Sequence, residues 1–256
     1  MPDPAMGESR IVQRLVVAVA VPLVVLAGNG TASAAEATRP GVTGIDVSHW
    51  QDAIDWPSVA RSGVRFAIAK ATEGQTFTDP RYAENKNGAE STGLEFTAYH
   101  FAQPDRAPGD AVSEADHFLD VADLSSGNLL PVLDIERTGG LTPRELVAWA
   151  RTWLARVQAR LGVRAVVYTN PAFWHTAMAN STWFARAGSP LWIAHYGRSA
   201  PHVPAYNWAG RGWTYWQDTN CGAVRGIAGC VDVNRLSTAE LTFMTMRSGP
   251  RLVGVA

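Results

Sequence analysis

The 256-residue sequence predicts an α/β fold, a barrel of parallel strands closed by a last third that contains little helix. Short apolar runs alternate with helical patterns as far as about residue 190. After that point Gly-, Pro- and Asn-rich loops, such as residues 197–212, join the remaining apolar runs. Because a parallel barrel binds its ligands at the C-terminal ends of its strands, residues at those ends are the candidate site residues.

Eight apolar runs are predicted to form the strands of this barrel. They cover residues 44–48, 66–71, 96–101, 129–135, 164–169, 191–195, 213–217 and 229–233. Helices are predicted at residues 57–62, 79–92, 110–124, 142–161 and 171–180. In the helix at 142–161, Thr142 fits the N-cap, Pro143 the first helical position, and Glu145 completes a capping box. Its apolar stripe at helical spacing predicts that it packs against the core.

The N-terminal 34 residues have the pattern of a secretory signal peptide. Arg10 and Arg14 precede a short apolar run at residues 15–27, and Ala-Ser-Ala at 32–34 fits a cleavage site. The alternative is an uncleaved anchor, for which the apolar run is short. Residues 35–43 are predicted to be a flexible lead-in and residues 248–256 a flexible tail, on either side of a single domain at 44–247.

Composition excludes some classes of partner. With 46% hydrophobic and 18% charged residues the chain suits a globular protein, and its net charge of −1 gives no electrostatic reason to bind nucleic acid or an anionic membrane. Export implies an oxidising compartment, so Cys221 and Cys230, which glycines flank, are predicted to form a local disulfide. The residues between them offer no His or carboxylate that would complete a metal site.

The segment 129–136 carries the most informative carboxylates. Its apolar run is typical of a buried strand and ends in Asp134 and Glu136, separated by Ile135. Alternate residues of a strand share one face, so the two carboxylates lie side by side and tend to hold a proton between them. Such a pair suits acid/base chemistry. A lone Asp-x-Glu is more often two solvated loop residues, so the interpretation depends on the rest of the chain.

Acids, aromatic rings and amides stand at the other predicted strand ends. The candidates are Asp46, Tyr99, Asp134, Glu136, Tyr168, Tyr196, Trp216, Gln217 and Asp232. Carboxylates lined by aromatic rings suggest cleavage of a sugar chain. His49, His100 and His195 also lie near the predicted mouth, but no metal-binding spacing is present, and no cofactor is expected.

Several motifs in the same order resemble glycoside hydrolase family 25, the Chalaropsis-type lysozymes or N-acetylmuramidases. They are Gly-Ile-Asp-Val-Ser-His-Trp-Gln at 44–51, Lys-Ala-Thr-Glu-Gly at 70–74, Ala-Tyr-His-Phe at 98–101, Pro-Val-Leu-Asp-Ile-Glu at 131–136, Tyr-Thr-Asn at 168–170 and Val-Asp-Val-Asn at 231–234. The resemblance covers residues 44–247 and implies a flattened barrel of five β/α units followed by three strands. It also implies an enzyme that hydrolyses the β-1,4 bond between N-acetylmuramic acid and N-acetylglucosamine in peptidoglycan, with retention of configuration. The signal peptide predicts that this enzyme is secreted, and a monomer is expected.

The resemblance suggests a role for each candidate residue. Glu136 is the expected general acid/base, and Asp134 is either the nucleophile or the residue that stabilises the substrate's own 2-acetamido group. Asp134 would otherwise only tune the pKa of Glu136. Asp46 and Asp232 are expected to end neighbouring strands beneath the site, the alternative being that they cap loop amides. The remaining candidates are expected to line the groove: Tyr99, Tyr168, Tyr196, Trp216 and Gln217.

Three other functions compete with this one. A non-catalytic wall-binding module would usually lack Asp134 or Glu136, and both are present. A barrel glycosidase acting on another N-acetylglucosamine polymer, such as chitin, would use nearly the same chemistry. An amidase or peptidase would need a zinc set or a Cys/His or Ser/His pair, for which the sequence shows no pattern.

Overall fold

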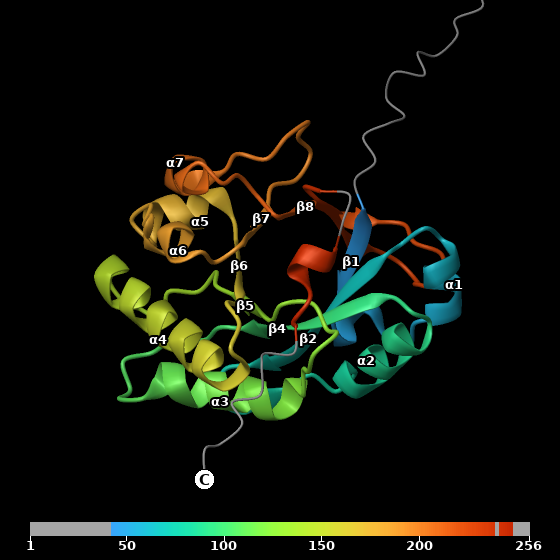
Figure 1. The fold of residues 1–256 in the computed structure, drawn as a ribbon, viewed down its shortest axis with the longest axis horizontal. Coiled ribbons are helices and arrows are strands. Elements are labelled where there is room, and N and C mark those ends of the chain that lie inside the picture. Colours follow the sequence, from blue (N-terminus) through green and yellow to red (C-terminus); the bar gives the residue numbers. More distant parts are fainter. Residues whose placement is uncertain (1–41, 239–240, 248–256) are drawn as a thin grey trace, which may run out of the picture. The chain divides into compact units, whose positions relative to one another are not determined.

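The computed structural model describes residues 42–238 and 241–247 (Figure 1). The predicted signal peptide at 1–34, the predicted lead-in up to residue 41 and the predicted tail at 248–256 lie outside the described residues. Within the described part of the chain, no helix combines the length and the apolar character that a membrane span requires.

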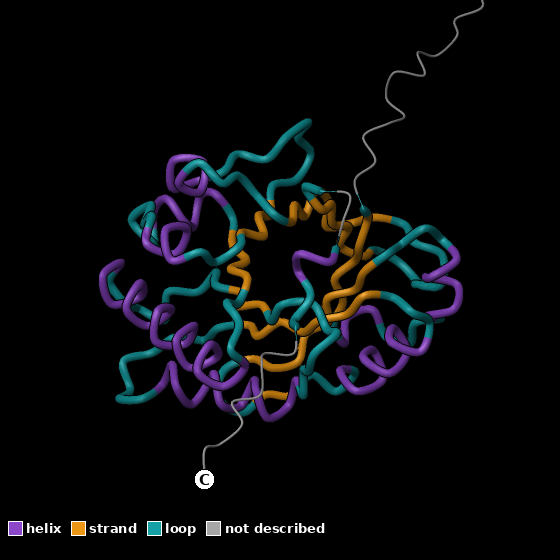
Figure 2. The backbone as a smooth tube through the Cα atoms, in the orientation of Figure 1, coloured by secondary structure: helices purple, strands orange, loops and turns teal. Residues whose placement is uncertain are grey.

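In the described residues, eight strands close into a barrel, and the fold class predicted from the sequence is confirmed (Figure 2). Each predicted run overlaps one strand. β1 pairs with both β2 and β9, which closes the ring. The strands are β1 (Thr43–Val47), β2 (Phe66–Glu73), β4 (Glu95–Phe101), β5 (Val132–Asp134), β6 (Val166–Thr169), β7 (Leu191–Ala194), β8 (Tyr215–Gly222) and β9 (Val231–Leu236). A short strand, β3 (Phe77–Thr78), adds an antiparallel hairpin to β2 and was not predicted.

The direction of β9 corrects the sequence prediction. Apart from the β2–β3 hairpin, neighbouring strands from β1 through β8 are parallel, whereas β9 runs antiparallel to both β8 and β1. Asp232 was expected near the end of a strand, but it is the second residue of β9. An antiparallel strand begins where its parallel neighbours end, so Asp232 still lies at the rim expected for the site. The register places it directly opposite Asp46.

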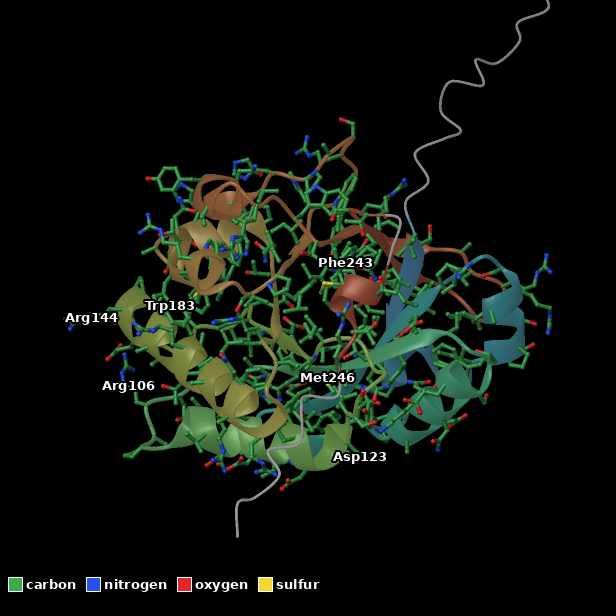
Figure 3. All side chains as sticks on the ribbon, in the orientation of Figure 1. Arg106, Asp123, Arg144, Trp183, Phe243 and Met246 are labelled. Atoms are coloured by element: carbon green, nitrogen blue, oxygen red, sulfur yellow. A yellow bond between two sulfur atoms is a disulfide. The ribbon has the colours of Figure 1, made fainter. Side chains whose placement is uncertain are left out.

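Helices surround the ring of strands (Figure 2). The five predicted helices correspond to α1 (Trp56–Arg61), α2 (Tyr82–Ser91), α3 (Asp110–Ala122), α4 (Pro143–Leu161) and α5 (Pro171–Thr176). The capping box of α4 forms as predicted, because Glu145 N donates to Thr142 Oγ1 at 3.4 Å and Thr142 N donates to Glu145 Oε2 at 2.7 Å. The charged side chains of Arg106, Asp123 and Arg144 project outward from the helix layer (Figure 3).

Two further helices were not predicted, α6 (Trp183–Ala187) and α7 (Pro204–Ala209). α7 lies in the loop at 197–212 that was expected to lack helix, and its residues from Ala205 to Ala209 have φ between 52° and 55°. This left-handed conformation costs roughly 1–2 kcal/mol per residue. Tertiary contacts offset the cost: Trp208 is buried, and its Nε1 donates to the Ser189 carbonyl at 2.8 Å. Sequence propensity does not reveal such contacts.

The core has two layers. The outer layer fills the space between the strands and the helices and includes the apolar stripe of α4. The inner layer fills the barrel itself with side chains such as Phe66, Ile68, Val132 and Trp192. A short 3₁₀ segment, η2 (Thr242–Met244), contributes Met244 to this inner layer. With the interior filled, open space is left at the rim of the barrel.

The predicted disulfide between Cys221 and Cys230 is present and joins the penultimate residue of β8 to the residue before β9. We expect replacement of both cysteines by serine to lower the free energy of unfolding by about 2–3 kcal/mol. The loss is limited because the disulfide closes a short loop, so removing it adds only modestly to the entropy of the unfolded chain. Equilibrium denaturation would measure the change, and reduction of the wild-type protein should reproduce it. An unchanged denaturation midpoint would contradict this expectation.

Candidate active site

A cavity of about 710 Å³ opens at the rim where the parallel strands end and β9 begins. Each strand of the barrel contributes to its lining: Asp46 from β1, Lys70 from β2, Tyr99 and Phe101 from β4, Asp134 from β5, Tyr168 from β6, Trp192 from β7, Gln217 from β8 and Asp232 from β9. Glu136 and Tyr196 join from the loops that follow β5 and β7. The structure therefore brings together eight of the nine side chains that the sequence singled out for the site.

Trp216 is the exception, and its predicted place in the groove is corrected. Trp216 and Gln217 are consecutive residues of β8, so their side chains point to opposite faces of the sheet. Gln217 faces the cavity, whereas Trp216 packs in the outer core, where its Nε1 donates to the His195 carbonyl at 2.9 Å. Strand alternation alone excludes both neighbours from lining the same groove.

Asp46 is held by two amide side chains. Its Oδ2 accepts hydrogen bonds from Gln217 Nε2 at 2.9 Å and from Asn234 Nδ2 at 2.6 Å. The oxygen of each amide is occupied elsewhere: Tyr168 and Tyr196 donate their hydroxyls to Gln217 Oε1 at 2.9 and 2.7 Å. Likewise, Trp192 Nε1 donates to Asn234 Oδ1 at 2.7 Å. Because an indole N–H only donates, this last contact fixes which end of Asn234 faces Asp46.

Asp46 and Asp232 form a pair with raised pKa values. Burial raises the pKa of Asp46 well above its usual range, the charge of Asp232 adds to the rise, and the two amide donors oppose it. Burial also raises the pKa of Asp232. Two facing carboxyl groups cannot both ionise cheaply, which favours a proton shared between them. With Oδ2 taken by two donors, a proton carried by Asp46 belongs on Oδ1.

Asp134 and Glu136 occupy the same side of the site. The backbone beyond β5 is pinned, because Ile135 N donates to the Tyr168 carbonyl at 3.0 Å and Thr169 Oγ1 donates to the Ile135 carbonyl at 3.2 Å. Burial raises the pKa of Asp134 well above its usual range, with Glu136 and Asp46 adding to the rise. Asp134 is 7% exposed, and its Oδ1 has no hydrogen-bond partner among the described residues.

Glu136 is less buried than Asp134 and lies between two cavities. Burial is the largest influence on its pKa and raises it, while the charge of Arg137 and a hydrogen bond with Asn170 lower it. A second cavity, of about 400 Å³, shares Glu136 and Tyr196 with the first and is bounded on the other side by Asn170 and His195. A chain-like substrate thus finds room on both sides of Glu136.

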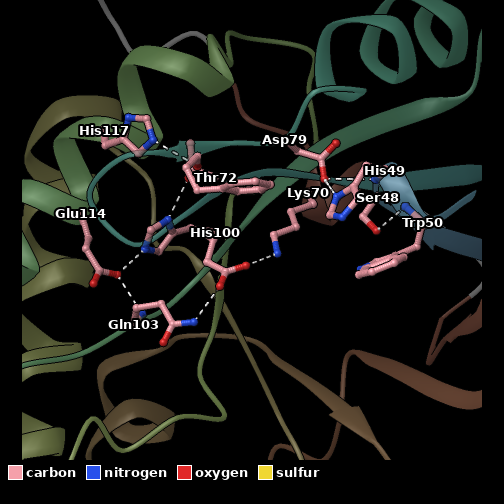
Figure 4. Close-up of polar contacts among 12 residues, drawn as sticks. Ser48, His49, Trp50, Lys70, Thr72, Asp79, His100, Gln103, Glu114 and His117 are labelled. Atoms are coloured by element: carbon pink, nitrogen blue, oxygen red, sulfur yellow. Dashed lines mark hydrogen bonds and ion pairs between the residues drawn. The ribbon is translucent and has the colours of Figure 1, made fainter. Parts of the chain in front are cut away.

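Lys70 is the cationic residue in the lining of the larger cavity. No role for it was predicted from the sequence. It is ion-paired with Glu73, whose other oxygen accepts from Gln103 Nε2 at 2.7 Å (Figure 4). Its charge lowers the pKa of Asp134. The signal was present in the sequence, because Lys70 interrupts an apolar strand at the position that shares the inner face with Ile68.

The described residues hold no group of three or more His, Cys, Asp or Glu side chains arranged to bind a metal ion.

Paired carboxyl groups with raised pKa values in a groove at one rim of a barrel are the arrangement that glycoside hydrolases use. A model of the family described as glycosyl hydrolases family 25 matches residues 45–227. The chain therefore belongs to glycosyl hydrolases family 25, as its motifs predicted.

Individual relatives agree with this assignment. The chain is 38% identical to lysozyme M1 of Streptomyces globisporus over 219 residues, which cover 82% of this chain and 72% of that protein. It is 34% identical to the N,O-diacetylmuramidase of Chalaropsis over 214 residues, covering 77% of this chain and 99% of that protein. Among solved structures, a bacterial lysozyme from Streptomyces coelicolor matches with a TM-score of 0.74 and 37% identity, over 80% of this chain and 95% of that one.

Because burial raises the pKa of Asp134, the stability of the fold is expected to depend on pH through this residue. An acid whose folded-state pKa is raised stabilises the fold below its unfolded pKa, and this contribution is lost as the pH rises through the folded value. The pH range over which this stabilisation is lost begins near the ordinary Asp pKa of about 4 and extends to higher pH. We therefore expect Asp134→Asn to raise the thermal midpoint at neutral pH and to have a smaller effect near pH 4.

Thermal unfolding monitored by circular dichroism across this pH range would measure the effect. Asp120→Asn is the matched control, because the Asp120 side chain is 72% exposed and its charge lies in water. A gain for Asp134→Asn that stays constant with pH, or a loss at every pH, would show that ionisation of Asp134 carries no cost.

Proposed function

We propose that the protein is a lysozyme, an N-acetylmuramidase that hydrolyses the β-1,4 bond between N-acetylmuramic acid and N-acetylglucosamine in peptidoglycan. The observation that carries this proposal is the pair Asp134 and Glu136 at the barrel rim, with one cavity on each side of Glu136. Relatives named lysozyme and N,O-diacetylmuramidase align over more than three quarters of the chain, which supports the same substrate class.

Glu136 is the proposed general acid and base. Its raised pKa keeps a proton available at mildly acidic pH, and its place between the two cavities puts that proton beside the bond that is cleaved. The proton passes to the leaving glycosidic oxygen as the bond to the anomeric carbon breaks. In the second half of the reaction, the Glu136 carboxylate takes a proton from the attacking water and is restored.

Asp134 is the proposed partner in forming the intermediate. In the route that we favour, the carboxyl group of Asp134, which lines the cavity, accepts the N–H of the substrate's 2-acetamido group, and the acetamido oxygen attacks the anomeric carbon from the face opposite the leaving group. In the other route, Asp134 itself forms the covalent bond to the sugar. Both give retention through two inversions. Only the second leaves a glycosyl group on the protein, which intact-mass spectrometry would detect.

The other acids hold the site. We propose that Asp46 and Asp232 keep a shared proton and a local negative charge beneath the sugar that develops positive charge. Tyr168 and Tyr196 present their rings to the cavity while their hydroxyls orient Gln217 toward Asp46. A change at Gln217 would thus act on the reaction through Asp46.

We further propose that the chain is exported, works outside the cell as a monomer, and makes no stable association with membrane or nucleic acid. The disulfide between Cys221 and Cys230 supports an oxidising compartment.

Replacing Glu136 by glutamine is expected to abolish turnover while the fold is retained, because glutamine has no proton to give the leaving group. Release of reducing ends from purified peptidoglycan measures the activity, and circular dichroism checks the fold. Turnover close to that of the wild type would remove Glu136 from the role of acid.

Asp134→Asn is expected to lower kcat by about 10²–10³, the loss typical of removing one electrostatic contact to a transition state. Only a minor loss would make Asp134 a supporting residue that tunes the pKa of Glu136.

The identity of the new reducing end tests the substrate. Digestion of defined peptidoglycan followed by mass spectrometry is expected to show N-acetylmuramic acid at the new reducing ends. N-acetylglucosamine at these ends, or faster cleavage of chitin, would favour a glycosidase for another polymer. Binding without any product would indicate a wall-binding module.

A further inference from the structure

Trp50 is an unusually exposed aromatic residue in the lining of the cleft. Its side chain is 79% exposed, yet it borders the same cavity as Asp46, Asp134 and Glu136. Burying an indole removes a large apolar area from water and stabilises a fold, and this chain forgoes most of that gain at Trp50. A flat apolar face left open inside a polar cleft indicates a ligand with an apolar face of its own.

The backbone of Trp50 is held in place. It lies in a one-turn 3₁₀ segment, η1 (His49–Gln51), whose capping box is complete: Trp50 N donates to Ser48 Oγ at 3.2 Å, and Ser48 N donates to Gln51 Oε1 at 2.9 Å. Gln51 Nε2 also donates to the Cys230 carbonyl at 3.4 Å. The segment is thus tied to the disulfide-bonded loop on the neighbouring side of the cleft.

The indole ring of Trp50 packs against the imidazole ring of His49, whose position is itself fixed. The ring centroids of His49 and Trp50 are 4.7 Å apart at an angle of 36°. Asp79 Oδ2 lies 2.7 Å from His49 Nδ1 and accepts from His49 N at 3.1 Å (Figure 4). Asp79 is only 2% exposed, so its position is set by the core. Trp50 therefore loses little conformational freedom when a ligand covers it.

We propose that Trp50 is a stacking platform for one hexosamine ring of the glycan strand. A pyranose ring carries a face of C–H groups that packs on an aromatic ring, while its hydroxyls and amide face outward. Polar side chains that also line the cavity beside Trp50 meet those groups: Ser48 on the same turn, Gln51 and Lys70. The proposal rests on the proposed function, because it takes the glycan strand as the ligand.

Binding to a catalytically inactive form tests the proposal. In the Glu136→Gln background, isothermal titration calorimetry with a peptide-free tetrasaccharide of alternating N-acetylglucosamine and N-acetylmuramic acid would give Kd. Trp50→Ala is expected to raise Kd roughly five- to tenfold, the size of an aromatic stacking contribution. Trp50→Leu should lose as much as alanine, because it is apolar but not flat, and Trp50→Phe should lose less.

Tyr206→Ala is the matched control, because Tyr206 is an aromatic residue of α7 that is 80% exposed and does not border the cleft. It should leave Kd unchanged, and the thermal midpoint of each variant should show that the fold is intact. An unchanged Kd for Trp50→Ala, or full affinity for Trp50→Leu, would overturn the stacking platform. A loss confined to peptide-bearing fragments would overturn the sugar as occupant.

The two proposals fail in different ways. If the tetrasaccharide does not bind the Glu136→Gln protein, the proposed function is wrong and the Trp50 platform falls with it. If the Glu136→Gln protein still cleaves the tetrasaccharide, the role of Glu136 as the acid is wrong and the substrate stands. If the tetrasaccharide binds tightly and its Kd does not depend on the residue at position 50, only the Trp50 platform is wrong.

Discussion

The pairing of β1 with both β2 and β9 is the constraint on which the site depends. It closes the ring, and its antiparallel register with β9 sets Asp46 directly opposite Asp232. Residues far apart in the chain then share one rim with Asp134 and Glu136. Carboxylates gathered in a partly buried place repel one another, and this repulsion with burial raises the pKa values that acid/base chemistry needs.

Hydrogen bonds from the surrounding polar side chains offset part of the repulsion among these carboxyl groups and hold them in position. Gln217 and Asn234 present their amide nitrogens to Asp46 because Tyr168, Tyr196 and Trp192 occupy the amide oxygens. Lys70 opposes the rise in the pKa of Asp134, and Glu73 balances the charge of Lys70. Gln217, Asn234 and Lys70 are thus each held by a second group, which reduces the reorganisation that the carboxyl groups need when charge develops during the proposed reaction.

The sequence predicted the barrel because its strands and the α4 cap follow local rules of periodicity and capping. It also predicted the acids, which stand where strands change to loops. The direction of β9, the left-handed turn of α7 and the place of Trp216 depend on partners distant in sequence, although alternation along β8 was enough to exclude Trp216. Lys70 and Trp50 stand within the quoted motifs but were given no role. Trp50 fits an ordinary turn position, whereas Lys70, a charged residue in a buried apolar strand, did carry a signal.

Unequal burial distinguishes the two carboxyl groups of the central motif, and the proposed mechanism gives them different roles. Glu136 lies at the junction of two cavities, where the proposed mechanism has it exchange protons, whereas Asp134 is more deeply buried and has one oxygen without a hydrogen-bond partner among the described residues. Burial makes the charged form of Asp134 costly in the free protein, and a donor that the substrate brings to this carboxyl group offsets part of that cost. In the proposed mechanism the amide N–H of an N-acetylated sugar is that donor, and a sugar without the acetamido group lacks it. The proposed mechanism thus links the burial of Asp134, which raises its pKa, to a preference for N-acetylated sugars.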